Sequence, residues 1–186
     1  GLGDANDYGL FHEEQNNRLR AQKLDEGLEI LAGLWSGEMF SYSGTHYQVE
    51  PIRFLPEPLQ QPRIPMWIGG GWDKLNPLKR AVKYDGYFPL KFGHNLTIEE
   101  WNWIRERIKQ HRTSDTPYTL IHGGYLPDDT QKASEMIVPY AEFGIDWWIE
   151  NIEPWRWGHT WDKLIPLQMI EDMEMRVRRG PPQLSK

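Results

Sequence analysis

The sequence predicts an α/β fold in which about four strand-and-helix (βα) units follow a helix and a hairpin arm. From Ile64 onward, short apolar stretches typical of strands alternate four times with amphipathic stretches typical of helices. The loops between them are short. Because neighbouring parallel strands are joined through a crossover helix, this alternation indicates a parallel sheet covered by helices.

The first predicted element is an amphipathic helix from about Asn16 to Trp35. Its apolar residues repeat at helical spacing: Leu24, Leu28, Leu31 and Trp35. Residues 36–62 are expected to form an insertion arm and a loop. Aromatic residues alternate with small ones around Ser43-Gly44, which predicts a hairpin with a glycine turn. The prolines that follow it predict an extended surface loop.

The four βα units follow this arm. Their strands are expected at residues 64–68, 86–90, 118–122 and 145–149, and their helices from about Asn76, Thr97, Thr130 and Thr160. Asn76 is expected to cap the first helix and Gly86 to end it in a left-handed turn. Thr97 and Glu100 have the spacing of a capping box.

Two architectures are compatible with this order of elements: an open, doubly wound sheet and part of a (β/α)8 TIM barrel. Four units make half of such a barrel, and the leading helix and arm look like the end of a preceding unit. We expect residues 1–186 to form a single domain, and the order of elements alone leaves both architectures open. Its exposed edge strands predict a homo-oligomer.

Composition narrows the classes of partner. The net charge is −6, which disfavours nucleic acid. No apolar run reaches the roughly 18 residues of a membrane span, so no membrane partner is expected. The sequence contains no cysteine, which fits a cytoplasmic protein, and its six histidines are scattered, so no metal site is predicted.

Four segments carry a family resemblance. Residues 20–37 have an Arg…Asp-Glu…Leu-Trp-x-Gly pattern, and residues 44–47 read Gly-Thr-His-Tyr in the arm. Residues 58–70 run from Pro-Leu-Gln to Ile-Pro-Met-Trp-Ile-Gly-Gly, and residues 84–89 contain Asp-Gly before a strand. Together they resemble the bacterial-luciferase-like monooxygenases, which depend on a flavin or a deazaflavin.

This resemblance implies an oxidoreductase that acts on a small organic substrate with FMN or coenzyme F420, two cofactors that the sequence does not distinguish. It also implies a complete barrel, in which Gly1–Gly3 would end the fourth strand and this chain would supply strands five to eight. In the family, the glycines that follow the strand predicted here at residues 64–68 hold the cofactor phosphate. The resemblance therefore makes Gly69, Gly70 and Gly71 the expected cofactor-binding residues. The alternative is a non-catalytic half-barrel that oligomerises and at most binds flavin or phosphate.

Barrel sites form at the carboxyl ends of the strands, which directs attention to the loops there. His122, Trp155 and Trp157 are the candidate residues of a substrate pocket; His122 could instead be a structural core histidine, and the tryptophans could cover an apolar end. Further polar candidates follow the strands: Lys91, His94, Asn151 and Glu153. No catalytic residue is assigned. The basic residues of the last helix, Arg176, Arg178 and Arg179, are expected to complement its dipole.

Overall fold

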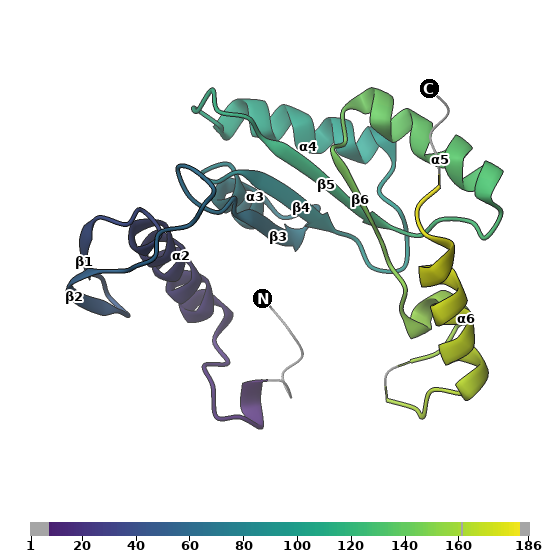
Figure 1. The fold of residues 1–186 in the computed structure, drawn as a ribbon, viewed down its shortest axis with the longest axis horizontal. Coiled ribbons are helices and arrows are strands. Elements are labelled where there is room, and N and C mark those ends of the chain that lie inside the picture. The colour runs from purple at the N-terminus through teal and green to yellow at the C-terminus, as the bar shows by residue number, and fades with distance from the viewer. Residues whose placement is uncertain (1–7, 161, 183–186) are drawn as a thin grey trace. The chain divides into compact units, whose positions relative to one another are not determined.

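The computed structural model describes residues 8–160 and 162–182 (Figure 1). The chain divides into two compact units, Gly1–Met66 and Trp67–Lys186. A single domain over residues 1–186 stays a prediction. The strand end expected at Gly1–Gly3 lies outside the described residues.

The first unit consists of a helix and a hairpin: α2 (Asn17–Leu34), β1 (Met39–Ser43) and the antiparallel β2 (Gln48–Arg53). Both were expected from the sequence. The side chain of Asn16 caps the helix by accepting from the backbone N–H groups of the next turn. Glu26 ties the hairpin to the helix, because its carboxylate accepts from the backbone N–H groups of residues 45–47.

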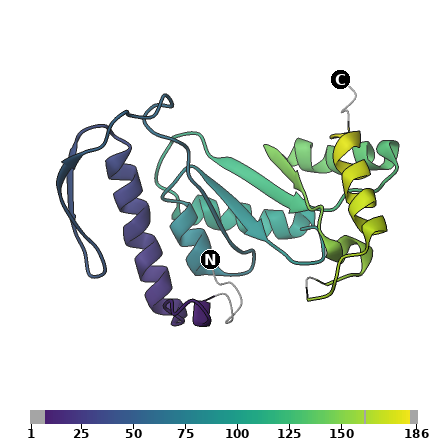
Figure 2. The ribbon, with the colours of Figure 1, turned by 60° about the horizontal axis from the view of Figure 1, so that its bottom comes forward.

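The second unit is a parallel sheet with helices. Its strands are β3 (Trp67–Gly71), β4 (Gly86–Leu90), β5 (Thr119–Gly124) and β6 (Trp147–Glu150), in that spatial order. Its helices are α3 (Leu75–Ala81), α4 (Ile98–His111), α5 (Thr130–Phe143) and α6 (Leu167–Arg179), with a 3-10 turn η1 (Pro154–Trp157) before α6. The four expected βα units are present, and α4 and α5 run along the sheet in both views (Figures 1 and 2).

One face of this sheet packs against helices. Side chains alternate between the two faces of a strand, and Ile68, Tyr87 and His122 point to the same face. All three are buried, as are Trp101 and Ile104 of α4. This helix-covered face therefore holds the core of the second unit.

The opposite face carries Trp67 on β3 and Trp147 on β6, the two edge strands. Their ring centroids lie 5.7 Å apart. The outer strands of a flat four-stranded sheet would be about 14 Å apart. Gly86, between them, makes room, since a Cβ there would lie 2.7 Å from the Trp67 ring. The sheet therefore coils toward this face, as the strands of a barrel do.

Three local expectations were wrong. Helix α3 begins at Leu75 with Lys74 as its N-cap, so Asn76 lies inside the helix, and Gly86 begins β4 instead of ending the helix. The last helix begins at Leu167, not near Thr160. Pro166 explains that difference, because proline restrains the residue before it and cannot donate within a helix. The capping box of Thr97 and Glu100 is confirmed.

Gly70 is the position in β3 where a side chain should disrupt the fold. A Cβ there would lie 2.2 Å from Cβ of Pro77 in α3. We expect Gly70→Ala to lower the free energy of unfolding by about 1–3 kcal/mol through overpacking, measured by urea denaturation. The matched control is Gly69→Ala, whose Cβ would have no neighbour closer than 3.7 Å. Equal stabilities of the two variants would contradict this packing.

Candidate functional site

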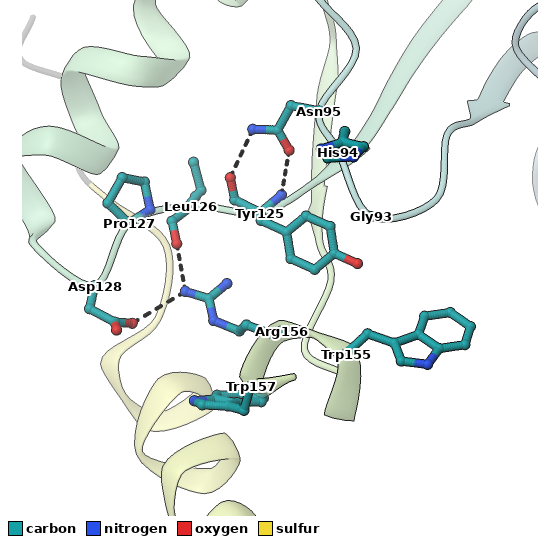
Figure 3. Close-up of a pocket in the computed structure, with 10 residues that line it drawn as sticks. All are labelled: Gly93, His94, Asn95, Tyr125, Leu126, Pro127, Asp128, Trp155, Arg156 and Trp157. Atoms are coloured by element: carbon teal, nitrogen blue, oxygen red, sulfur yellow. Dashed lines mark hydrogen bonds and ion pairs between the residues drawn. The ribbon is translucent and has the colours of Figure 1, made fainter. Parts of the chain in front are cut away.

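A cavity of about 550 Å³ opens at the edge of the sheet where β4, β5 and β6 end (Figure 3). Three segments line it: residues 93–95 after β4, residues 125–128 after β5, and residues 155–157 of η1 after β6. In parallel α/β sheets, ligands bind at the carboxyl ends of the strands. The cavity therefore lies where the topology favours a binding site, and two of the candidate residues, Trp155 and Trp157, line it.

Asn95 joins two of these segments. Its Nδ2 donates to the carbonyl oxygen of Tyr125 at 2.9 Å, and its Oδ1 accepts from the backbone N–H of Tyr125 at 2.7 Å (Figure 3). The side-chain amide thus pairs with the backbone of Tyr125 through both of its polar groups. These two hydrogen bonds hold together the pocket segments that follow β4 and β5.

Glu150, the last residue of β6, holds the third segment. Its carboxylate accepts from Nη1 of Arg156 at 3.0 Å and from Nε and Nη2 of Arg176, each at 2.7 Å. Arg176 is only 4% exposed. Arg156 also donates to the carbonyl of Leu126 and to Asp128 (Figure 3). The carboxylate therefore ties η1 and α6 to the sheet.

Arg176 lies in the last turn of α6, where it was expected to complement the helix dipole, and it also binds Glu150. Arg178 pairs with Glu174 on the surface of α6, and Arg179 donates to the backbone carbonyl of Asp128. Both Arg156 and Arg176 therefore form ion pairs with the carboxylate of Glu150.

The pocket offers aromatic walls and a few polar groups. Trp155 is exposed and meets Phe92 edge to face, and Trp157 lies beside Arg156. The hydroxyl of Tyr125 donates to Oε1 of Glu153. Two effects raise the pKa of Tyr125: burial, which is the larger, and the neighbouring carboxylate of Glu153. The phenol is therefore neutral at physiological pH. Such a pocket can hold a small organic molecule and orient it by hydrogen bonds.

His122 lies elsewhere, on the helix-covered face of β5. Its Nδ1 accepts from Nε1 of Trp101 at 3.0 Å, and its ring centroid lies 4.2 Å from that of Trp148. The imidazole is fully buried, and burial lowers its pKa to about 4. The structure thus puts His122 in the core and not among the residues that line the pocket.

The three glycines are the last residues of β3, one strand away from the pocket. They pair with residues 88–90 of β4, so they belong to the strand instead of the expected loop after it. None of them has a positive φ. Gly70 faces Pro77 of α3, whereas Gly69 and Gly71 lie on the other face, the face of Trp67. They share an edge of the sheet with the pocket, but they do not line it.

Comparison with known proteins decides the family. Residues 3–153 match the family described as luciferase-like monooxygenase. The chain belongs to this family. The half-barrel order of βα units agrees with the resemblance seen in the sequence.

Individual relatives of this luciferase-like chain match over a shorter stretch. Uncharacterized proteins of Mycobacterium tuberculosis and Mycobacterium bovis are 35% identical over 68 residues, which make up 37% of this chain and 22% of theirs. An F420-dependent glucose-6-phosphate dehydrogenase of Microbacterium testaceum is 36% identical over 70 residues, 37% of this chain and 20% of that protein. The matched part is thus about a fifth of each relative's length.

Several pocket residues were missed at the level of sequence: Asn95, Tyr125, Asp128 and Arg156. Two signals could have found some of them. Asn95 follows His94, which was a candidate and does line the pocket, and Tyr125 comes directly after the glycines that end β5. Lys91, also a candidate, binds both carboxylate oxygens of Glu100 at 2.8 Å and so supports α4 instead.

Two searches of residues 8–160 and 162–182 were negative. No helix in this part combines the length and apolar character needed to cross a membrane. No group of three or more histidine and acidic side chains is arranged there to hold a metal ion.

The buried imidazole makes stability depend on pH. His122 titrates near 6.5 when unfolded and near 4 when folded, so below pH 6.5 the unfolded chain binds a proton that the folded chain excludes. The stability that the neutral His122 contributes is therefore complete above pH 6.5 and is lost as the pH falls toward 4. The loss in the free energy of unfolding is on the order of 3 kcal/mol.

Urea denaturation at pH 7.5 and at pH 4.5 measures this loss. His122→Gln keeps an acceptor for Nε1 of Trp101 and removes the titration, so it should lose less stability than the original chain between these two pH values. Parallel losses in the two proteins would contradict the assignment of His122 to the core.

The ion pairs of Glu150 should contribute far more than a surface pair. Glu150→Ala leaves the buried guanidinium of Arg176 without its partner, which should cost about 3–5 kcal/mol of unfolding free energy. Glu174→Ala, which breaks an exposed pair with Arg178, is the control and should cost less than about 1 kcal/mol. If both cost the same in thermal and urea denaturation, Glu150 does not anchor η1 and α6.

Proposed function

We propose that this chain forms part of an oxidoreductase that uses a flavin-type cofactor, FMN or coenzyme F420, on a small organic substrate. The observation that carries the proposal is the aromatic pocket at the carboxyl edge of the sheet, in a chain of the luciferase-like monooxygenase family. One partial relative is named for F420-dependent oxidation of glucose 6-phosphate, which supports the deazaflavin among the two cofactors.

The residues of β3 fit the phosphate end of such a cofactor. Gly69 presents bare backbone, since a Cβ there would be 3.7 Å from its nearest neighbour, so a ligand can come close to the main chain. Lys74 stands three residues beyond Gly71, and its ammonium group pairs with the carboxylate of Asp73 at 2.8 Å. Trp67 and Leu90 lie on the same face as Gly69 and offer apolar surface to a tricyclic ring. We assign the phosphate contact to Gly69 and Gly71.

When bound, this cofactor supplies the exchange of a hydride with the substrate. The chain's own residues bind and orient the reactants. Trp155 and Trp157 wall the substrate pocket, and His94 lines it with a polar side chain. Arg156 holds η1, and with it both tryptophans, in place through Glu150. A cytoplasmic location is part of the proposal, supported by the absence of cysteine.

A second candidate is a half-barrel without turnover that binds only the flavin or a phosphate. Under this candidate the cofactor would bind, but no substrate would be converted.

Cofactor binding by the purified chain tests the proposal. We expect FMN or coenzyme F420 to remain with the protein through gel filtration and to change its absorption spectrum. Gly69→Ala should weaken binding roughly tenfold, which corresponds to about 1.4 kcal/mol, without loss of stability, since its Cβ would make only ordinary contacts, the nearest with the carbonyl oxygen of Phe88 at 3.7 Å.

The matched control is Gly27→Ala in α2, where a Cβ meets nothing within 4 Å. It should bind the cofactor as the original chain does. Failure of both cofactors to bind, or full binding by Gly69→Ala, would overturn the proposed site. Conversion of substrate with the bound cofactor separates the oxidoreductase from the second candidate.

A further inference from the structure

The pocket at the carboxyl edge of the sheet has a cationic end that is formed by three arginines. Arg156 lies in η1, and Arg176 and Arg179 lie in α6. The carboxylate of Glu150 pairs with Arg156 and Arg176. The carboxylate of Asp128 pairs with Arg156 and Arg179. Three guanidinium groups thus meet two carboxylates, which leaves one positive charge in excess.

Two further carboxylates stand close to this cluster in the sequence and have other partners. Asp129 caps α5 by accepting from the backbone N–H of Lys132, and Glu153 accepts from the hydroxyl of Tyr125. Neither Asp129 nor Glu153 lines the pocket. The whole chain has a net charge of −6, so the positive excess is a local feature of this end of the pocket.

Arg156 is the arginine of this cluster that lines the pocket. Its side chain is only 10% exposed, so its charge is screened less than a charge on the surface. A guanidinium has five N–H groups, and hydrogen bonds to the described residues Glu150, Leu126 and Asp128 use three of them (Figure 3). An N–H group on Nε and one on Nη1 are therefore available to a ligand.

The rest of the pocket wall is largely apolar. Aromatic and aliphatic side chains line it: Tyr125, Leu126, Pro127, Trp155 and Trp157. The ring centroid of Trp157 lies 5.6 Å from Cζ of Arg156, so the aromatic wall adjoins the guanidinium. A ligand that fills this cavity would place a charged group at Arg156 and an apolar body against the indole rings.

We propose that the substrate of this pocket is a small organic anion, whose carboxylate, sulfonate or phosphate group binds Arg156 while its apolar body packs against Trp155 and Trp157. This inference rests on the proposed function, because it names the substrate class of the same pocket. A single negative charge on the substrate balances the excess charge of the cluster. Its hydrogen bonds with the guanidinium are charge-assisted, which makes them about twice as strong as hydrogen bonds between neutral groups.

An NMR titration of the full 186-residue chain, labelled with ¹⁵N and free of cofactor, tests this inference. The probes share one ring: benzoate, benzenesulfonate and phenyl phosphate, with benzamide as the neutral control. At least one anion should shift the Nε–H signal of Arg156 and the indole signals of Trp155 and Trp157. It should also bind at least about tenfold more tightly than benzamide. No shift of these signals with any anion, or equal affinity for benzamide, would overturn the inference.

Two variants that remove the same charge separate this site from long-range effects of charge. Arg156→Gln should weaken binding of the anion at least about tenfold. Arg178→Gln is the matched control, because Arg178 forms an exposed pair with Glu174 and does not line the pocket. This control should change the affinity less than about twofold, since solvent screens exposed charges. Equal losses in the two variants would contradict binding at Arg156.

Asp128→Asn gives a test that does not depend on the position of η1. This variant removes a negative charge from the cluster but keeps an oxygen that can accept from Arg156. It should therefore tighten binding of the anion about threefold and leave binding of benzamide unchanged. A purely structural role of Asp128 does not predict a gain in affinity, so unchanged or weaker binding would also overturn the inference.

The outcomes for the substrate and for the cofactor are distinguishable. Anion binding is measured without cofactor, and cofactor binding is measured without these anions. Failure of the anions alone leaves the proposed oxidoreductase function in place. Failure of both cofactors alone leaves an anion-binding pocket without that function.

Discussion

The pocket depends on one carboxylate. Glu150 ends the last strand of the sheet and receives hydrogen bonds from Arg156 in η1 and from the buried Arg176 in α6. Three parts of the chain are held at this point, including the turn that carries Trp155 and Trp157. Because buried charges are costly unless they are paired, the ion pairs of the two arginines with Glu150 keep these parts together. Ion pairs thus help to hold the turn that carries the aromatic wall of the site.

The two faces of the sheet serve different purposes. The helix-covered face is a closed core, in which His122 accepts from Trp101 and stays neutral. The other face keeps bare backbone at Gly69 beside exposed Trp67. The two adjacent glycines differ in their surroundings: Gly70 allows the close approach of Pro77, whereas a Cβ at Gly69 would have no neighbour closer than 3.7 Å. One short strand thus carries α3 on one face and, in the proposed function, part of the cofactor site on the other.

Much of the fold could be predicted from the sequence, because helices and strands differ in apolar period and because the capping box of Thr97 marks a helix start. The start of α6 was missed, since its apolar spacing seemed to continue through Pro166. The sequence did not determine the sheet face to which His122 points, because a shift of one residue in the strand moves every side chain to the opposite face. The pairing of Glu150 with Arg176 joins residues 26 positions apart and has no local signal. The pocket likewise assembles residues from three loops.

The central claim is that the glycine-bearing face and the aromatic pocket of this luciferase-like chain together bind a flavin-type cofactor and its substrate. Two-dimensional NMR of the ¹⁵N-labelled chain, titrated with FMN and separately with coenzyme F420, tests it most directly. The account predicts shifts of the backbone amides of Gly69 and Gly71 and of the indole signals of Trp67 and Trp155, while the buried indole of Trp101 stays unchanged. Shifts restricted to residues of α2 and the hairpin, or no shifts with either cofactor, would contradict it.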